Sequence, residues 1–454
     1  MPCDPISSVG LACREWAYRD GGSAGDGDNL KSLLFGQIAR RLSWGIADQA
    51  ISSITNFAVS IYVARSLGDV QFGAFSLAYI TYPFVLNASR GLATDPLMVR
   101  FSSVSLKAWR RAVADCTGTS TVVGLVAGVL VLAVTSLLHG YASLAFLGLG
   151  ISLPGLMLQD SWRFAFFALG RGSQAFINDC IWAVTLVPGL IIVQRSGHAN
   201  VFWFILAWGM SATIAAIAGL LQSGVVPKIT GTREWLAKQR DLGIRFFVEG
   251  SATSGAQQLR SYGVGFILSL AAVGYIQAAN TVMGPIMILF LGMGLVTTPE
   301  AARILHRSPK RLPLFCMMVS AGLVVAGLAW GVILVVVFPR GLGQIMFGHI
   351  WRSTYPLAIP QTLYILGMCV VTGASAGLHA LGAAQRSMRG MMILSAIYLV
   401  LGILGAVVDG TTGAVLGTAI ASWTGAVIYW WELRTAMRLY NAGARSHLAA
   451  TVAA

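Results

Sequence analysis

Long apolar segments recur along almost the whole chain, and each is long enough to cross a lipid bilayer. Residues 42–433 contain about twelve of them, counted as stretches of about 20 apolar residues that span a hydrocarbon core of about 30 Å. A helix satisfies its backbone hydrogen bonds within one such segment. The sequence therefore predicts an all-α, polytopic membrane protein of about twelve transmembrane helices. The predicted spans are residues 42–64, 72–94, 112–137, 142–168, 174–194, 201–222, 243–270, 273–298, 313–338, 356–381, 388–408 and 412–433.

The composition excludes a soluble protein of this length, because 56% of the residues are hydrophobic and only 11% are charged. The formal charge of +14 is typical of nucleic-acid binding, but its distribution argues against that class. Lys and Arg gather in every second loop, which is the positive-inside pattern and predicts that both termini are cytoplasmic. We expect the surplus charge to set the topology and to attract anionic lipid headgroups, with no nucleic-acid partner. The basic residues of these loops include Lys31, Arg40, Arg41, Arg100, Lys107, Arg110, Arg111, Lys228, Arg233, Lys238, Arg303, Arg307, Lys310, Arg311, Arg386, Arg389, Arg434 and Arg438.

The remaining segments are too short for a separate soluble domain. The six cysteines have neither disulfide nor metal-ligand spacing, so no metal or cofactor is expected. The Gly/Asp-rich stretch GGSAGDGDN near the N-terminus predicts disorder. The predicted organisation is a disordered cytoplasmic tail (1–40), a six-helix bundle (41–224), a cytoplasmic linker (225–242), a second six-helix bundle (243–436) and a cytoplasmic tail (437–454).

An internal duplication relates the two predicted bundles. At one constant offset, Asp48 matches Glu249, Asn56 matches Gln257 and Gly73 matches Gly274. With a drift of one residue, Pro83 matches Pro285, and each proline is expected to allow a helix kink. Both halves enter the membrane from the same side, so they are predicted to be parallel repeats. Transporters built in this way bind substrate between the halves.

Polar side chains spaced four apart mark the first helix of each half. Asp48, Ser52 and Asn56 form one stripe, and Glu249, Thr253, Gln257 and Arg260 form the other. A charged group at the bilayer centre costs about 2.5–3.5 kcal/mol, so neither stripe is expected to face lipid. We predict that the two stripes face one another across a shared watery cavity. For the hydroxyl groups the alternative is hydrogen bonding between packed helices.

Arg90, on the second predicted span, lies at about the depth of Asp48. It either pairs with Asp48 or presents a free cation to the cavity. Asp160 and Arg163 are three residues apart and are expected to satisfy one another on their own helix. No further role is assigned to that pair.

The segment RRLSWGIADQAISSITNFAVSIYVARSLGDVQFGAFSLAY resembles the first two helices of bacterial polysaccharide flippases of the O-antigen and teichoic-acid type. Their superfamily also contains multidrug extruders and lipid II flippases. The resemblance implies a bacterial plasma-membrane protein that moves an undecaprenyl-pyrophosphate-linked glycan, or a similar anionic lipid, to the outer leaflet by alternating access. It implies glycosyltransferases of the same pathway as partners, and arginines, here Arg90 and Arg260, as ligands of the pyrophosphate. The resemblance rests on Trp44, Asp48, Gln49, Ser53, Asn56, Phe57, Ala64, Arg65, Phe72, Gly73, Phe75 and Pro96.

Two other functions stay open. A cation-coupled multidrug antiporter would use Asp48 or Glu249 as the carboxylate that exchanges a proton or sodium ion. A membrane glycan polymerase or ligase would use the outside loop at residues 339–356, which contains Arg340, His349 and Arg352 but no third group to orient them. Otherwise Trp351 and Tyr355 of this loop are expected to anchor at headgroup depth. No nucleotide-binding motif occurs, so ATP is not the expected direct energy source.

Overall fold

The computed structural model describes residues 26–453 except 103 and 198, and describes most side chains between residues 43 and 442. Within that part of the chain every regular element is helical, which confirms the predicted all-α fold. The first helix, α2 (Asp26–Ser66), begins inside the stretch predicted to be a disordered tail. The helical part of the chain therefore starts earlier than expected.

The N-terminal half contains six helical passes. The second of them, α3, continues through a short π-helix, η1, into α4, so the helix changes its winding at Arg90. The linker to the next half is also ordered, with η2 (Ile229–Gly231) and α9 (Thr232–Lys238) packed against α5. The passes are α2, α3 (Asp69–Ser89) with η1 (Arg90–Thr94) and α4 (Asp95–Arg100), α5 (Leu106–Thr135), α6 (Gly140–Ala168), α7 (Gly172–Arg195) and α8 (Val201–Ser223).

The C-terminal half repeats this order of helices. Its last label, α17 (Ala384–Ala453), covers two passes, because the backbone leaves helical geometry at Asp409 and Gly410. Gly410 has a φ of 56°, a conformation that glycine adopts without a Cβ penalty. The other passes are α10 (Arg240–Ile267), α11 (Leu270–Val282) with α12 (Gly284–Arg307), α13 (Leu312–Val336, preceded by η3, Pro309–Arg311) and α16 (Ala358–Ala380). Between α13 and α16 lie η4 (Phe338–Arg340), α14 (Leu342–Phe347), η5 (Gly348–Ile350), α15 (Trp351–Thr354) and η6 (Tyr355–Leu357).

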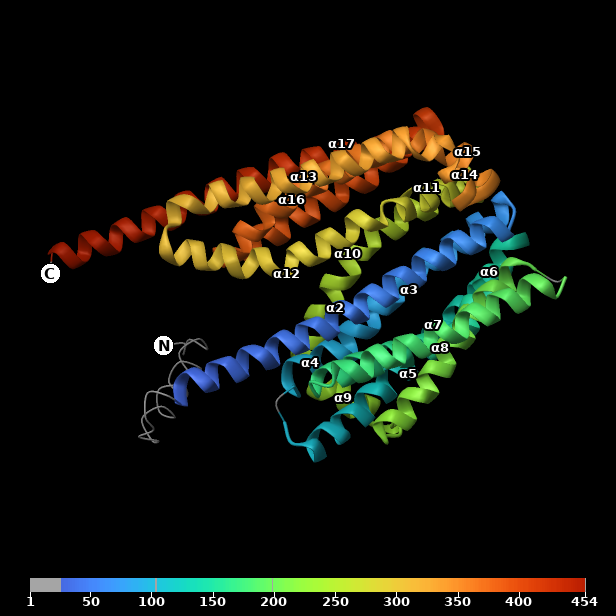
Figure 1. Cartoon of the computed structure of the whole chain (residues 1–454), viewed down its shortest axis with the longest axis horizontal. Helices are drawn as coiled ribbons and strands as arrows, with labels where there is room; N and C mark the ends of the chain where they lie inside the picture. The colour runs from blue at the N-terminus through green and yellow to red at the C-terminus, as the bar shows by residue number, and fades with distance from the viewer. Residues whose placement is uncertain (1–25, 103, 198, 454) are drawn as a thin grey trace.

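The two halves form two bundles that meet at one end and diverge towards the other (Figure 1). The start of α2 and the end of α17 both lie at the diverging end, in agreement with termini on one side of a membrane. Two parallel six-helix repeats are therefore confirmed. The domain boundaries given above stay predictions.

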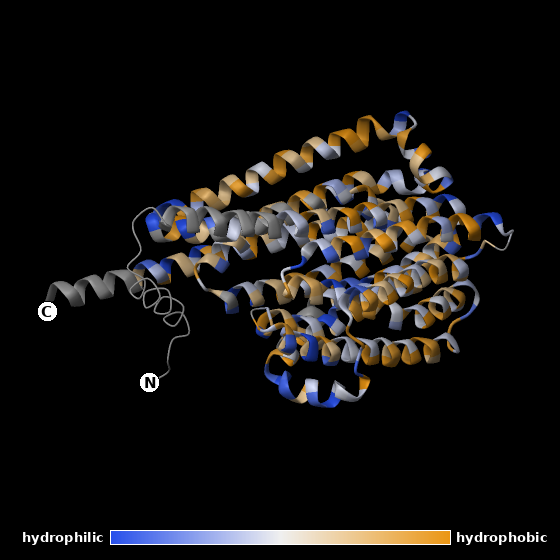
Figure 2. Ribbon diagram, turned by 60° about the horizontal axis from the view of Figure 1, so that its bottom comes forward, coloured by the Kyte–Doolittle hydropathy of each residue, from blue (hydrophilic) through white to orange (hydrophobic). Residues whose placement is uncertain are grey.

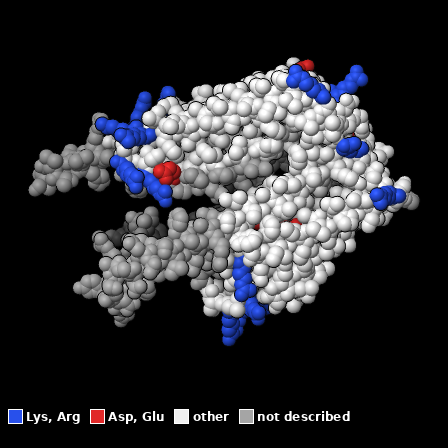
Figure 3. Space-filling view, viewed as in Figure 1, with Lys and Arg blue, Asp and Glu red and all other residues white. Residues whose placement is uncertain are grey.

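Seven helical segments of the described residues are long and apolar enough to cross a membrane. Figure 2 shows that apolar residues cover most of the helix lengths and that hydrophilic residues concentrate near the helix ends. In the view of Figure 3, Lys and Arg gather at the ends of the bundles and leave an almost uncharged belt between them. The chain is a multi-pass membrane protein. The passes outside the seven consist of α2, α3, α10, α11 and α12, which carry many of the polar residues described below.

The matched prolines have different effects in the two halves. Pro83 lies inside the continuous helix α3. Pro285 lies in the first turn of α12, directly after the break that separates α12 from α11. The kink expected at both positions therefore becomes a helix break only in the C-terminal half.

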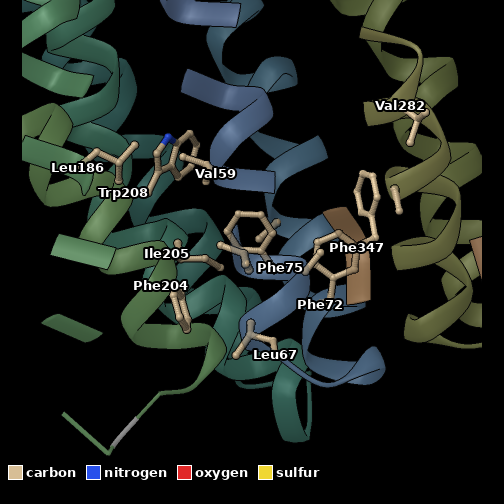
Figure 4. Close-up of a cluster of buried hydrophobic side chains, with 14 of the residues drawn as sticks. Val59, Leu67, Phe72, Phe75, Leu186, Phe204, Ile205, Trp208, Val282 and Phe347 are labelled. Carbon is tan, nitrogen blue, oxygen red and sulfur yellow. The ribbon is translucent and has the colours of Figure 1, made fainter. Parts of the chain in front are cut away.

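A hydrophobic core joins the bundles at the end where they meet. Figure 4 shows Phe72 and Phe75 of α3 between Phe204 of α8 on one side and Phe347 of α14 on the other. These aromatic side chains are fully buried. The core therefore crosses from one half to the other rather than stopping at the bundle surface.

At this closed end the two repeats cross at the matched glycines. A Cβ added to Gly73 would lie 1.8 Å from the carbonyl oxygen of Leu270, and one added to Gly274 would lie 3.0 Å from the backbone nitrogen of Gly73. Only glycine permits this approach of the α3 and α11 backbones. Nearby, Asp69 accepts a hydrogen bond from the Tyr275 hydroxyl at 2.6 Å, which adds a polar contact between the halves.

The crossing predicts that Gly73→Ala forces α3 and α11 apart at the closed end. Ser60 borders the space between the bundles. In a Ser60→Cys background, the introduced thiol should then react several-fold faster with a membrane-impermeant reagent added on the side of the closed end. Gly68→Ala is the matched control, since nothing lies within 4 Å of its added methyl group. Equal labelling of the introduced thiol in the two variants would contradict the idea that the glycine crossing holds this end closed.

Candidate functional site

A cavity of about 970 Å³ lies between the two bundles and is lined by both. We call it the central cavity. The N-terminal half contributes residues of α2 and α3, and the C-terminal half contributes residues of α11 and α12. Its lining residues are Gln49, Ser53, Ile54, Asn56, Phe57, Ser60, Tyr79, Gln277, Asn280, Thr281, Gly284, Pro285, Met287 and Phe290.

The polar groups of the central cavity are amides and hydroxyls, and none of these lining side chains is of a type charged at neutral pH. Ser60 and Thr281 share a hydrogen bond of 2.9 Å across the two halves. The Gln361 side chain of α16 donates to Asn280 at 2.6 Å from behind the cavity wall. The remaining lining is apolar, so the cavity suits a ligand with both hydroxyl groups and hydrocarbon surface.

A second, smaller cavity of about 250 Å³ lies inside the N-terminal bundle. It shares Gln49, Asn56 and Tyr79 with the central cavity, so the two spaces adjoin along these side chains. We call it the N-bundle pocket. Its wall contains Asp160, Arg163 and Asp179 together with Arg90, Gln159, Ser52, Tyr82, Pro83, Leu86, Leu156, Trp182 and Trp208.

Arg163 of α6 is the centre of a buried ionic cluster beside this pocket. Its Nε donates to Asp48 Oδ2 of α2 at 2.8 Å and lies 3.2 Å from Asp179 Oδ2 of α7. Gln159 donates to the other oxygen of Asp179 at 2.9 Å. The Arg163 side chain is only 13% exposed. Three helices are therefore held together by one guanidinium group.

Arg90 pairs with Asp160 rather than with Asp48. Its Nε and Nη2 donate to the two oxygens of Asp160 at 2.9 and 2.6 Å, a forked geometry, and its guanidinium lies 4.9 Å from the Phe164 ring centroid. Arg163 Nη1 is 4.0 Å from Asp160, at the limit of an ion pair. Neither the Asp48–Arg90 pair nor a self-sufficient Asp160–Arg163 pair occurs, because the arginines on η1 and α6 exchange the expected partners.

The cluster contains one more carboxylate than guanidinium groups, since Asp48, Asp160 and Asp179 face Arg90 and Arg163. Asp48 is 1% exposed, and its Oδ1 atom is buried without a hydrogen-bond partner. A buried carboxylate oxygen in that situation needs a proton or a cation. The described residues contain no group of three His, Cys, Asp or Glu side chains that could hold a metal ion.

The first predicted stripe winds around its helix instead of facing one space. Residues four apart on an α-helix are offset by about 40°. Asp48 therefore lies in the ionic cluster, Ser52 lines the N-bundle pocket, and Asn56 lines both the pocket and the central cavity. Of this stripe, only Asn56 reaches the space shared by the two halves.

The second stripe is divided in the same way. The side chains of Glu249 and Thr253 lie outside the described residues, Gln257 is exposed, and Arg260 is 5% exposed inside the C-terminal bundle. The neighbouring Gln258 donates to Thr81 of α3 at 2.9 Å, so a residue outside the predicted stripe contacts the other half. Spacing along α10 could not reveal this contact, because it depends on how α10 is rotated towards α3.

Several residues that line the central cavity were not predicted from the sequence. Gln277, Asn280 and Thr281 follow one face of the eighth predicted span at spacings of three and four, a signal comparable to the stripes that were singled out. Tyr79 and Asn280 stand at the repeat offset and both line the central cavity. Their identities differ between the halves, which is why the duplication did not reveal them.

The loop at residues 339–356 covers the closed end instead of forming a separate site. His349 Nε2 lies 2.9 Å from Asp69 Oδ1, which ties the loop to α3. Trp351 is 7% exposed and packs among Phe338, Phe347 and Tyr355. The prediction that Trp351 anchors at the membrane interface is therefore wrong, because its ring is buried among the aromatic side chains of the loop.

Comparison with solved structures places the fold among known transporters. An inward-facing multidrug resistance MATE family transporter of the MOP superfamily aligns with a TM-score of 0.72 and 13% identity, over 87% of this chain and 99% of that chain. The lipid II flippase MurJ in an inward closed conformation aligns with a TM-score of 0.67 and 14% identity, over 87% of each chain. No protein-family model and no curated protein sequence matches the chain. At these identities the likeness shows the fold.

A further transporter structure shares the fold. An outward-facing MATE family transporter of the MOP superfamily aligns with a TM-score of 0.54 and 14% identity, over 89% of this chain and 96% of that chain.

The ionic cluster predicts a strong dependence of stability on Arg163. Arg163→Gln leaves Asp48 and Asp179 buried without their shared cation, and losing one partner of a buried ion pair costs about 3–5 kcal/mol. The thermal midpoint of the purified protein should fall clearly. Adding Asp48→Asn to Arg163→Gln should recover part of the loss.

Arg100→Gln is the control for this prediction, because Arg100 forms an exposed pair with Asp241. Exposed pairs contribute about 0–1 kcal/mol. Thermal midpoints that fall equally in Arg163→Gln and Arg100→Gln would contradict the central position of Arg163.

Proposed function

We propose that this protein is an alternating-access transporter that moves a lipid-linked oligosaccharide or polysaccharide precursor from the cytoplasmic to the outer leaflet of a bacterial plasma membrane. The observation that carries the proposal is the central cavity, which is lined by both repeats and lies between bundles that meet at the closed end and diverge towards the other. A cavity in that position changes its accessible side when the bundles rock against one another. The glycine crossing at Gly73 would open when the other end closes.

The lining of the central cavity supports a saccharide as the polar part of the substrate. Gln49, Asn56, Gln277 and Asn280 supply side-chain amides, which both donate and accept hydrogen bonds and so match sugar hydroxyls. The hydrocarbon tail of a lipid-linked substrate would stay in the bilayer while the headgroup occupies the cavity. We also propose that glycosyltransferases of the same pathway assemble the headgroup and deliver the lipid-linked substrate to this protein.

A pyrophosphate would not meet a free arginine in the described part of the central cavity. Arg90 is engaged by Asp160 through both of its forked donors, and Arg260 lies in the C-terminal bundle. An anionic linkage would therefore have to compete with Asp160 for Arg90. For this reason we assign recognition to the sugar hydroxyls and treat Arg90 as a group released only when Asp160 is neutralised.

The excess carboxylate of the ionic cluster supports coupling to a proton or a monovalent cation. When Asp48 is neutralised, the remaining charges of the cluster balance, and α2, α6 and α7 can pack without an unpaired charge. When the ion leaves, the cluster again holds one uncompensated carboxylate beside the pocket that adjoins the central cavity. The two states of Asp48 would thus favour different packings of the N-terminal bundle.

The same carboxylate supports a second candidate, a cation-coupled multidrug antiporter. The aromatic and aliphatic lining, with Phe57, Tyr79 and Phe290, also suits a hydrophobic drug. The solved MATE family structures share the fold. This candidate requires that transport of the drug depends on the cation gradient and on Asp48, and that lipid-linked saccharide is not moved.

The first test uses proteoliposomes that contain a lipid-linked oligosaccharide, with exposure to an outside glycan-binding protein as the readout of flipping. Asn56→Leu and Asn280→Leu each remove an amide from the central cavity, and each should lower the initial rate about tenfold, since leaving a bound polar group without its hydrogen bond costs about 1–3 kcal/mol. Gln385→Leu, an exposed amide on α17, is the matched control and should flip at the wild-type rate. Unchanged rates in both cavity variants would contradict saccharide binding in this cavity.

The second test separates the two candidates by imposing a proton or sodium gradient. Asp48→Asn should abolish the response to the gradient, because the variant cluster is already balanced at two carboxylates and two guanidinium groups. Gradient-driven efflux of a cationic dye without any flipping of the lipid-linked oligosaccharide would favour the antiporter. Flipping of the lipid-linked oligosaccharide without gradient-driven efflux of the dye would favour the proposed function.

A further inference from the structure

Arg260 is a buried cation without a carboxylate among the described residues. It lies on α10, is 5% exposed, and makes no hydrogen bond or ion pair with any of them. Its Nε is fully buried and unpartnered. The backbone at position 249, the acidic position of the same helix, is about 16 Å away along the helix axis. By contrast, both arginines of the N-terminal cluster have carboxylate partners.

The C-terminal bundle is shaped to hold this side chain. Gly402 of α17 leaves room for the arginine stem, because a Cβ at that position would lie 2.6 Å from Arg260 Cδ. Tyr398, one turn earlier on α17, places its ring 5.1 Å from the guanidinium carbon. This cation–π contact attracts the guanidinium but neutralises no charge. Gly402 and Tyr398 thus form a cradle that positions the cation. None of the Arg260 N–H donors forms a hydrogen bond to the described residues.

A line of polar side chains leads from the central cavity to this cradle. Gln361 donates to Asn280 of the cavity wall, and Tyr364 follows one turn later on α16. The Tyr364 and Tyr398 rings are 6.0 Å apart. Neither phenol hydroxyl has a hydrogen bond to a described residue, so each keeps an O–H donor that a ligand could use.

From this arrangement we infer that the interior of the C-terminal bundle binds one small monovalent anion, of the chloride type, against Arg260. A buried ion without a counter-ion is strongly unfavourable, so the site needs one negative charge. A singly charged ion balances one guanidinium, whereas a phosphate would leave a net negative charge and further oxygen atoms without donors. The two bundles then complement one another, with a cation site at Asp48 and an anion site at Arg260.

The test compares thermal midpoints of the purified full-length protein in chloride and in gluconate, at constant ionic strength and pH. Binding to the folded state raises the midpoint, and we expect a rise of about 2 °C at saturating chloride. Arg260→Met should show no difference between the two salts, and its midpoint in gluconate should equal or exceed that of the wild type, because the uncompensated charge is gone. Arg389→Met, which replaces an exposed arginine on α17, should keep the wild-type difference.

Gly402→Ala provides a second readout that keeps the arginine in place. Its methyl group would displace the Arg260 stem, so the chloride concentration for the half-maximal shift should rise several-fold. This variant decides the matter if Arg260→Met does not fold. No salt difference in the wild type, a difference that persists in Arg260→Met, or an unchanged half-maximal concentration in Gly402→Ala would overturn the inference. Since binding is measured without transport, failure here leaves the proposed function untouched.

Discussion

The ion pairs of Arg163 with Asp48 and Asp179 are the contacts on which the N-terminal bundle depends. Each of these groups is too costly to expose to lipid, so each must find a partner on another helix. Because the three groups come from α2, α6 and α7, neutralising the charges also fixes how these helices pack. Arg163 therefore both compensates the buried carboxylates and sets the packing of α2, α6 and α7.

The two repeats have the same helices but opposite unbalanced charges. The N-terminal cluster has one carboxylate too many, and the C-terminal bundle buries Arg260 without a carboxylate among the described residues. The glycines at the closed end, in contrast, are the same in both halves, because the close approach of two backbones excludes any side chain at Gly73 and Gly274. The glycine crossing is thus the same in both halves, whereas the charges inside the two bundles differ. Such divergence lets one bundle respond to a cation and the other to an anion, as proposed above.

Much of the architecture could be predicted from the sequence. The apolar segments predicted the helices, and the matched pairs such as Asp48 and Glu249 predicted two parallel bundles. The candidate site was predicted only in outline: Asn56 reaches the central cavity, but Asp48 and Arg260 lie inside their own bundles. Asp160 was recognised as ionisable but not as a member of a cluster that includes Arg90. Spacing along one helix gives the directions of its side chains relative to one another. The position and rotation of the neighbouring helix decide which residues those side chains contact.

The sequence by itself determined that the chain crosses a membrane many times, that its two halves are parallel repeats, and that charged groups must be enclosed. The number of passes and the need to enclose charge follow segment by segment, because the bilayer imposes the length and apolarity of each segment independently of the others. The repeats follow from residues matched at one offset between the halves. Only the tertiary structure decided that Arg90 pairs with Asp160, that Arg163 joins three helices, and that Arg260 has no ionic partner among the described residues. Those outcomes depend on helix rotation and crossing, where a stripe winds by about 40° for every four residues and no single segment contains both members of a pair.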